Sequence, residues 1–209
     1  MQKRTLRTAL ALCTLASAAL GSGCAGMGAR LSPQATGAHL NIMALNLANN
    51  RAEIAEGQLA LTNASAPAVR EFAQEMVTEH TANLQRQEQL MQQMGLTAET
   101  LMALPVARQM EENHRAAMAV LTPARGAPFD RAYMERQAAM HRYALETIDA
   151  MRGIATGGGT AEGAGTPLDV DVRGMNAGRA TEFEQETRAV IAEHEQHAQQ
   201  VRGTLGGAM

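Results

Sequence analysis

The sequence has no tryptophan, and aromatic residues make up only 2% of its 209 residues, against 45% hydrophobic residues. Sandwiches and barrels depend on aromatic and β-branched side chains, so this scarcity argues against an all-β fold. The remaining apolar residues are largely Ala, Leu and Met, which pack well on helices. The composition therefore predicts an all-α protein with one domain.

A concentrated positive charge is also missing. The chain has 18 Lys and Arg against 21 Asp and Glu, which gives a formal net charge of −3. The charge would become −6 without residues 1–23, which carry Lys3, Arg4 and Arg7 and no acidic residue. Because nucleic-acid phosphates are bound by clustered Lys and Arg, we expect no nucleic-acid partner.

Long apolar runs are absent except for one near the N-terminus. Residues 1–23 combine the basic residues with an apolar segment over 8–20 and small residues before Cys24, which is the pattern of an export signal peptide. The segment is too short for a stable membrane span. Residues 20–24 (LGSGC) resemble a bacterial lipobox, although its Leu lies one position further from the cysteine than usual.

We therefore expect Cys24 to be lipidated and to anchor the mature protein to the membrane. Ordinary signal-peptidase cleavage, with Cys24 incidental, is the alternative. The residue after the cysteine is Ala25 and not Asp, which resembles the pattern of lipoproteins sorted to the outer membrane. This predicts a lipoprotein of the cell envelope, on the outer membrane and facing the periplasm. Cys13 leaves with the signal, so the mature chain has no internal disulfide.

The rest of the chain reads as a tether and one helical domain. Residues 24–36 hold the lipidated Cys and a flexible tether. Residues 37–203 should form the domain, with a Gly-rich loop at 153–174, and residues 204–209 a frayed tail. Apolar residues at helical spacing predict four long helices and one short helix. The long helices cover about 37–63, 67–94, 129–152 and 176–202, and the short one covers 106–121.

Turn residues mark where these helices begin and end. Ser65 is expected to cap the second long helix, Pro67 lies in its first turn and Gly95 ends it. The connection before Pro67 is so short that the first two long helices must be antiparallel. The short helix then lies in a long crossover between the second and third long helices, so we expect an antiparallel four-helix bundle.

Residues 69–84 carry the most informative pattern. Their apolar side chains form one stripe at helical spacing, and the titratable residue on that stripe is His80. Two later helices repeat the arrangement with His141 and His194. The first helix has a polar strip beside its apolar face, formed by Asn46, Asn49, Asn50, Glu53 and Glu56.

Glu53, His80, His141 and His194 each lie within about one turn, or about 5.4 Å, of the middle of their own helix. The middles coincide in an antiparallel bundle, so these side chains should converge at one level, as metal ligands do in bundles. Unmatched buried polar groups cost about 1–3 kcal/mol each, so they must bond one another or share an ion. We predict a Zn, Cu or Fe ion there, lost below about pH 6 if the imidazoles titrate normally. A closed polar network without an ion is the alternative.

Over about residues 40–201 the chain resembles the DUF4142 family, ferritin-like exported bacterial proteins often labelled predicted outer membrane proteins. The resemblance rests on residues 53–60 (EIAEGQLA), 69–73 (VREFA), 76–81 (MVTEHT) and 129–133 (FDRAY), with His141 and His194. It implies a ferritin-like bundle, an envelope location and the same four polar positions, but no established activity. The chain departs from the family in its Gly-rich loop and in Glu79, where Asp is more usual.

Other metal chemistries are weaker fits. Di-iron oxidases take Glu-x-x-His from two helices of the bundle, and here only Glu111 and His114 have that spacing, on the crossover helix. Thioether and imidazole together suit Cu(I), although Met at helical spacing is more often core filling. His194 and His197 could form a surface clip. The secondary metal candidates are therefore His114, His197, Met76 and Met140.

The sequence thus favours a noncatalytic role. We expect an envelope lipoprotein that binds a metal ion at the Glu/His cluster. A structural or stress-related interaction protein is the alternative, and a ferroxidase-type enzyme is less favoured.

Overall fold

The computed structural model describes residues 33–155 and 177–206, and all regular structure in these ranges is helical, as the sequence predicts. The predicted signal peptide, Cys24 and most of the tether lie outside the described residues, as do most of the Gly-rich loop and the last three residues. The helices are α1 (Pro33–Asn63), α2 (Pro67–Met94), α3 (Ala98–Met102), α4 (Pro105–Leu121), α5 (Gly126–Ala155) and α6 (Ala177–Gly206).

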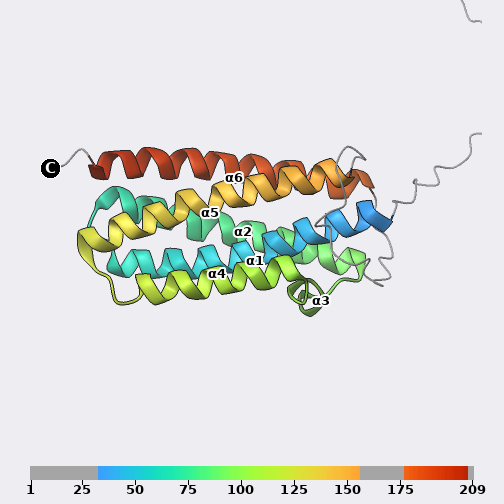
Figure 1. Cartoon of the computed structure of the whole chain (residues 1–209), viewed down its shortest axis with the longest axis horizontal. Coiled ribbons are helices and arrows are strands. Elements are labelled where there is room, and N and C mark those ends of the chain that lie inside the picture. The colour runs from blue at the N-terminus through green and yellow to red at the C-terminus, as the bar shows by residue number, and fades with distance from the viewer. Residues whose placement is uncertain (1–32, 156–176, 207–209) are drawn as a thin grey trace, which may run out of the picture.

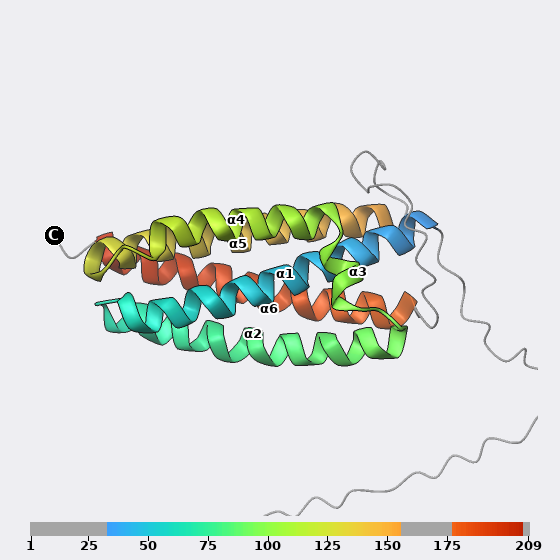
Figure 2. The same ribbon diagram turned by 90° about the horizontal axis from the view of Figure 1, so that it is seen from below.

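All helices except α3 lie side by side along the long axis of the molecule (Figures 1 and 2). The pair α1 and α2 is antiparallel, and so is the pair α5 and α6. Helices α2 and α5 point the same way, because α4 carries the chain back to the end where α2 began. The crossover connection between the second and third long helices is therefore itself a helix that packs along the molecule.

Helix α1 is the central element. It packs against α2, α3, α4 and α5 and touches α6. Every residue from 38 to 50 is buried, and this stretch contains no Asp, Glu, Lys or Arg. The polar strip of α1 is buried too, because its side chains face three neighbouring helices: Asn46 and Asn50 face α2, Glu53 faces α5, and Glu56 faces α4 and α5.

The core is divided along the long axis into two apolar clusters. One contains residues from the first half of α1, from the end of α2 and from the beginning of α4. The other contains the beginnings of α2 and α5 and the end of α6, with Phe72, Phe129 and Tyr133 packed edge-to-face or stacked. A layer of buried polar residues, among them Asn50, Glu53, His80, His141 and His194, lies between the two clusters, near the middle of the helices. Because the helices are antiparallel, each contributes its central turns to this polar layer.

The predicted end of α2 is confirmed and its predicted cap is wrong. Gly95 has φ 68°, a left-handed conformation that favours glycine and ends the helix. At the other end the N-cap is Ala66, without a side-chain bond, and the Ser65 hydroxyl instead donates to Asp130 at 2.5 Å. The Asp130 carboxylate also accepts the backbone N–H groups of Ser65 and Ala66, each at 3.0 Å. A carboxylate from α5 therefore holds the turn that precedes α2, and no side chain caps the helix itself.

Other boundaries differ by a turn or less. Helix α1 begins at Pro33, inside the predicted tether, and α6 continues to Gly206, inside the predicted tail. The short helix α3 is an addition, and the Thr97 hydroxyl caps it by accepting the Thr100 N–H at 3.1 Å. Within residues 33–155 and 177–206, no helix combines the length and the apolar character needed to cross a bilayer.

Candidate metal centre

Three histidines from three helices meet in the polar layer. His80 comes from α2, His141 from α5 and His194 from α6, and each is at most 1% exposed. Their ring centroids are 5.0 Å apart for His80 and His194, 5.3 Å for His141 and His194, and 6.0 Å for His80 and His141. One ligand nitrogen from each ring lies within 4.8 Å of the other two. The apolar stripes of the three helices thus bring the histidines together.

The outer nitrogen of each ring has a hydrogen-bond partner that fixes its tautomer. His80 Nδ1 donates to the Asn50 side-chain oxygen at 2.8 Å, and His141 Nδ1 donates to the Gln137 backbone oxygen at 2.8 Å. His194 Nε2 donates to the Glu79 carboxylate at 2.8 Å. Carbonyl and carboxylate oxygens only accept, so each bonded nitrogen carries a proton.

The other nitrogen of each ring is buried and has no hydrogen-bond partner. These atoms are His80 Nε2, His141 Nε2 and His194 Nδ1. Since the proton is on the opposite nitrogen, each presents a free lone pair, the form in which imidazole binds a metal. An unpaired buried polar atom costs about 1–3 kcal/mol, and here three occur in one cluster. A closed polar network would give these nitrogens partners, and in the described part of the chain they have none.

The electrostatics keep His80 and His141 neutral. Burial, with the neighbouring His194, lowers the pKa of His141 from 6.5 to about 3. Burial, with His141 and His194, also lowers the pKa of His80 well below 6.5. Proton competition at these two rings therefore begins far below pH 6, and the expectation of loss near pH 6, which assumed ordinary imidazoles, is wrong for them. That expectation takes no account of burial, which lowers the pKa of an imidazole.

Glu53 lies at the edge of the trio. Its Oε1 is 4.0 Å from His141 Nε2, and neither carboxylate oxygen has a hydrogen-bond partner. The carboxylate does not belong to the compact set formed by the three histidines. Burial and the nearby charge of Glu56 raise the pKa of Glu53 well above 4.5. The structure thus places an acid whose pKa is raised 4.0 Å from His141, in position to become a fourth ligand by losing its proton.

Two of the secondary candidates, His114 and His197, each have a carboxylate partner. His114 Nδ1 lies 2.9 Å from Glu56, which also accepts from Arg136 at 3.2 Å. His197 Nδ1 lies 2.9 Å from Glu75, so the residue pairs across α2 and α6 rather than with His194. In the chain as described, neither belongs to a group of three converging ligands.

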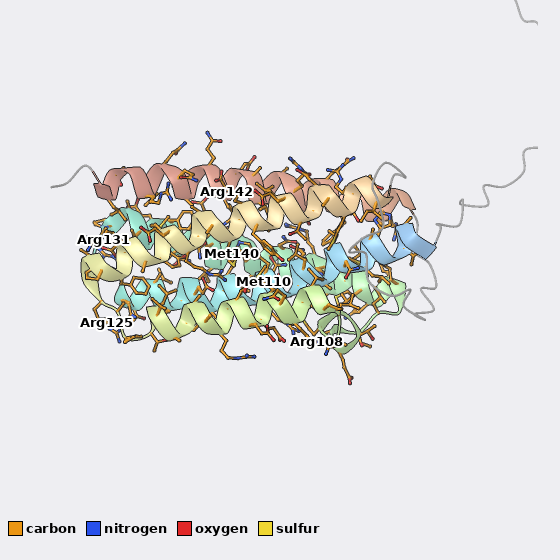
Figure 3. All side chains as sticks on the ribbon, in the orientation of Figure 1. Arg108, Met110, Arg125, Arg131, Met140 and Arg142 are labelled. Atoms are coloured by element: carbon orange, nitrogen blue, oxygen red, sulfur yellow. The ribbon has the colours of Figure 1, made fainter. Side chains whose placement is uncertain are left out.

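The methionine candidates belong to the apolar core. Met76 is fully buried in one cluster and Met140 is buried in the other. In Figure 3, Met140 and Met110 lie within the outline of the bundle, whereas Arg108, Arg125 and Arg131 lie at its edges. Core filling, the alternative considered for Met at helical spacing, describes both.

Sequence reasoning missed the residues that orient the imidazoles. Asn50 is assigned above to a polar strip, Gln137 acts through its backbone, and Glu79 is noted only as a departure from the family pattern. Two signals were available: Glu79 directly precedes His80, and Gln137 precedes His141 by one helical turn. Spacing alone could not select them, because a hydrogen bond depends on where a neighbouring helix lies.

A family model described as Domain of unknown function (DUF4142) matches residues 27–162. The match includes Glu53, His80 and His141 and ends before α6, which carries His194. Comparison with curated proteins and with solved structures gives no match.

Proposed function

The chain belongs to the DUF4142 family, and we propose that it is a metal-binding protein of the bacterial envelope that holds one transition-metal ion at His80, His141 and His194. The family description carries no activity, so the proposal rests on the site. The observation that carries it is the set of three buried imidazole nitrogens, all without partners and all on rings whose other nitrogen is bonded.

The hydrogen-bond partners of the outer ring nitrogens favour a bound ion, and not a packing defect, as the reason why the inner nitrogens lack partners. Metal-binding histidines usually donate their second N–H to a carboxylate, a carbonyl or an amide oxygen, which fixes the ring and raises its basicity. Asn50, Gln137 and Glu79 do this for the three rings. Three nitrogen ligands with a carboxylate nearby suit Zn(II), Cu(II) or Fe(II) and separate these ions poorly.

The topology supports a ferritin-like bundle. One crossover connection among four long helices is the arrangement of ferritin-like folds, in which side chains of facing helices form the metal site. The ligand set differs from that of di-iron enzymes, because the polar layer brings three histidines and one glutamate together. The Glu111-x-x-His114 pair lies on α4, where Glu111 is exposed and His114 bonds Glu56. Binding is therefore the better-supported role, and we assign no reaction.

Envelope location belongs to the same proposal. The support is the pattern of residues 1–24, with basic residues, an apolar segment and small residues before Cys24. A lipid on Cys24 would hold the helical domain at the membrane surface, and the membrane would then be its first partner.

Calorimetric titration of untagged protein with Zn(II) and Cu(II) at about pH 7.5 tests the site, with imidazoles deprotonated. We expect one ion per chain at micromolar or tighter affinity, and at least a tenfold loss in His141→Ala. His197→Ala is the matched control, because it removes an imidazole that belongs to no converging group, and its affinity should stay at the wild-type value. Uptake that survives His141→Ala, or that falls with His197→Ala, would contradict the assignment. Circular dichroism melts of each variant check that the fold is kept.

The role of Glu53 shows in the pH dependence. If an ion displaces the carboxyl proton, affinity falls as the pH is lowered, even though the two depressed imidazoles remain neutral. Glu53→Gln keeps the shape and cannot ionise, so its affinity should be lower at about pH 7.5 and change less toward about pH 5.5. If the metal affinities of wild type and Glu53→Gln changed with pH in parallel, Glu53 would not be a ligand.

A further inference from the structure

His194 has one face in the buried site and one face toward the surface. Its ring is buried, and Nδ1 lies among the unpartnered nitrogens of the trio. Its Nε2 bonds Glu79, whose side chain is 47% exposed. The partners of His80 and His141 are a buried asparagine and a buried backbone oxygen. Of the three rings, only His194 therefore connects the buried trio to a group that solvent reaches.

A second set of potential ligands surrounds this outer face. Glu75, Glu79 and His194 each offer a ligand atom within 4.8 Å of the others. The Glu75 carboxylate is held 2.9 Å from His197 Nδ1. Two carboxylates and one imidazole form a mixed oxygen and nitrogen set that suits a divalent transition metal. His194 belongs to this outer set and to the inner trio.

The outer set and two members of the trio, His80 and His194, lie along the seam between α2 and α6. These two helices share few contacts compared with α1 and α2 or with α5 and α6. A small hollow opens on the same seam, lined by Asn83 and Arg86 of α2 and by Phe183, Glu186, Thr187 and Val190 of α6. Asn83 lies about one helical turn beyond His80, so the hollow and the outer ligands lie on either side of His80 along this seam. His194 links the seam to the trio.

We propose that Glu75, Glu79 and His194 form an outer site through which divalent cations enter and leave the buried trio. The proposal rests on the proposed function of the trio. The solvent-accessible carboxylates of Glu75 and Glu79 attract the cation and hold it beside His194, from where it passes to the unpartnered nitrogens of the trio.

A residue of an entry route has a kinetic signature that a merely orienting residue lacks. An ion that enters and leaves by one route crosses the same barrier in both directions. Removing an outer carboxylate then lowers the association and dissociation rate constants by the same factor and leaves Kd unchanged. A residue that only orients His194 would instead change Kd, because it alters the bound state itself. Glu75 is the better residue to test, because no bond joins it to His194.

The test is stopped-flow uptake of Co(II) by untagged full-length protein, followed by the visible absorption of the bound ion, with release measured by an excess of chelator. Glu75→Gln should slow uptake and release about fivefold or more at low salt, with the difference shrinking as salt is added. Glu88→Gln is the matched control, since it makes the same charge change on an exposed part of α2 on the opposite face. It should behave as wild type.

Each result decides a different claim. Glu75→Gln rates equal to the wild-type rates, with normal binding, would overturn the entry route and leave the proposed function intact. A changed Kd with an unchanged association rate would also overturn it, by making the outer carboxylate part of the bound state. Absence of any Co(II) absorption in the wild type would overturn the proposed function and the route together. Glu79→Gln, which keeps an acceptor for His194 Nε2, should repeat the slowing.

Discussion

At the scale of single residues, the proposed metal site depends on which of the two ring nitrogens of each histidine carries the proton. Each of the three rings donates its outer N–H, and the inner lone pairs remain without partners. Burial keeps His80 and His141 neutral, because a charged imidazole loses more hydration than a neutral one on entering the core. The same burial keeps the proton on Glu53. His80 and His141 can therefore accept an ion without first losing a proton.

The raised pKa of Glu53 predicts how the stability of the ion-free protein depends on pH. Above its usual pKa of 4.5, the unfolded chain loses the Glu53 proton while the folded protein keeps it, so the folded state is destabilised as pH rises. Each pH unit with a full proton of difference changes the free energy of unfolding by about 1.4 kcal/mol. Glu53→Gln cannot ionise and removes this loss. We expect the ion-free variant to be more stable than wild type at about pH 8 and similar at about pH 4.

Urea unfolding with a chelator present, repeated across this pH range, gives the difference between the two proteins. The depressed pKa values of His80 and His141 act in the opposite direction, because the unfolded chain binds protons that the folded protein refuses below pH 6.5. They act equally in wild type and variant and cancel in the comparison. A difference in stability that did not depend on pH would mean that the Glu53 carboxylate is ionised in the fold.

At the scale of helices, α1 determines how tightly the others assemble. Its Gly57 faces α2 where the two helices approach most closely. A Cβ at this position would lie 2.8 Å from Val77 Cγ2 and 3.2 Å from the Ala73 backbone oxygen. The backbone oxygen cannot move aside as a flexible side chain can, so this glycine is required for packing.

Two glycine substitutions should therefore have opposite effects. Alanine improves helix propensity by about 1 kcal/mol at either position. At Gly57 the clash with α2 costs about 1–3 kcal/mol, so Gly57→Ala should lower the melting temperature. At Gly203 in α6 an added Cβ meets no atom within 4 Å, so Gly203→Ala should raise it. Thermal melts of both variants beside wild type make the comparison, and a stabilised Gly57→Ala would show that the helices can move apart freely.

At the scale of the whole molecule, the domain consists of two apolar clusters with a polar layer between them. Aliphatic and aromatic packing on either side stabilises the bundle, and this allows its middle to hold groups that lack partners. The proposed lipid on Cys24 would tie this domain to the membrane through its N-terminal segment. The site would then face the periplasm while its position is kept by the anchor.

The anchor predicts where the protein is found in the cell. Wild-type protein should fractionate with membranes and carry a lipid that slightly changes its mobility in gels. Cys24→Ser removes the thiol that would be acylated and should release the protein as a soluble or unprocessed form. The double substitution Lys3→Ala with Arg4→Ala, in the basic segment, is a control that should slow export without preventing acylation of exported chains. Membrane fractionation that is unchanged in Cys24→Ser would contradict the lipoprotein assignment.

The sequence by itself determined the helical class, most helix ends and the meeting of the three histidines. Gly95 ends α2 by its own backbone preference, and Pro67 begins it, so these features are local. The convergence of His80, His141 and His194, with Glu53 at its edge, followed from helical spacing together with antiparallel neighbours, which align the middles of helices. These conclusions needed only periodicity and the length of one connection.

Tertiary structure alone decided which groups surround those residues. Asp130 of α5 holds the turn before α2, the polar strip of α1 is buried against α2, α4 and α5, and the tautomer of His194 depends on Glu79 of another helix. Each depends on the rotation of one helix about its axis relative to another. Periodicity shows which face of a helix is apolar, but hydrogen-bond partners and pKa shifts depend on atoms a few ångströms away on neighbouring helices, whose positions only the packed structure fixes.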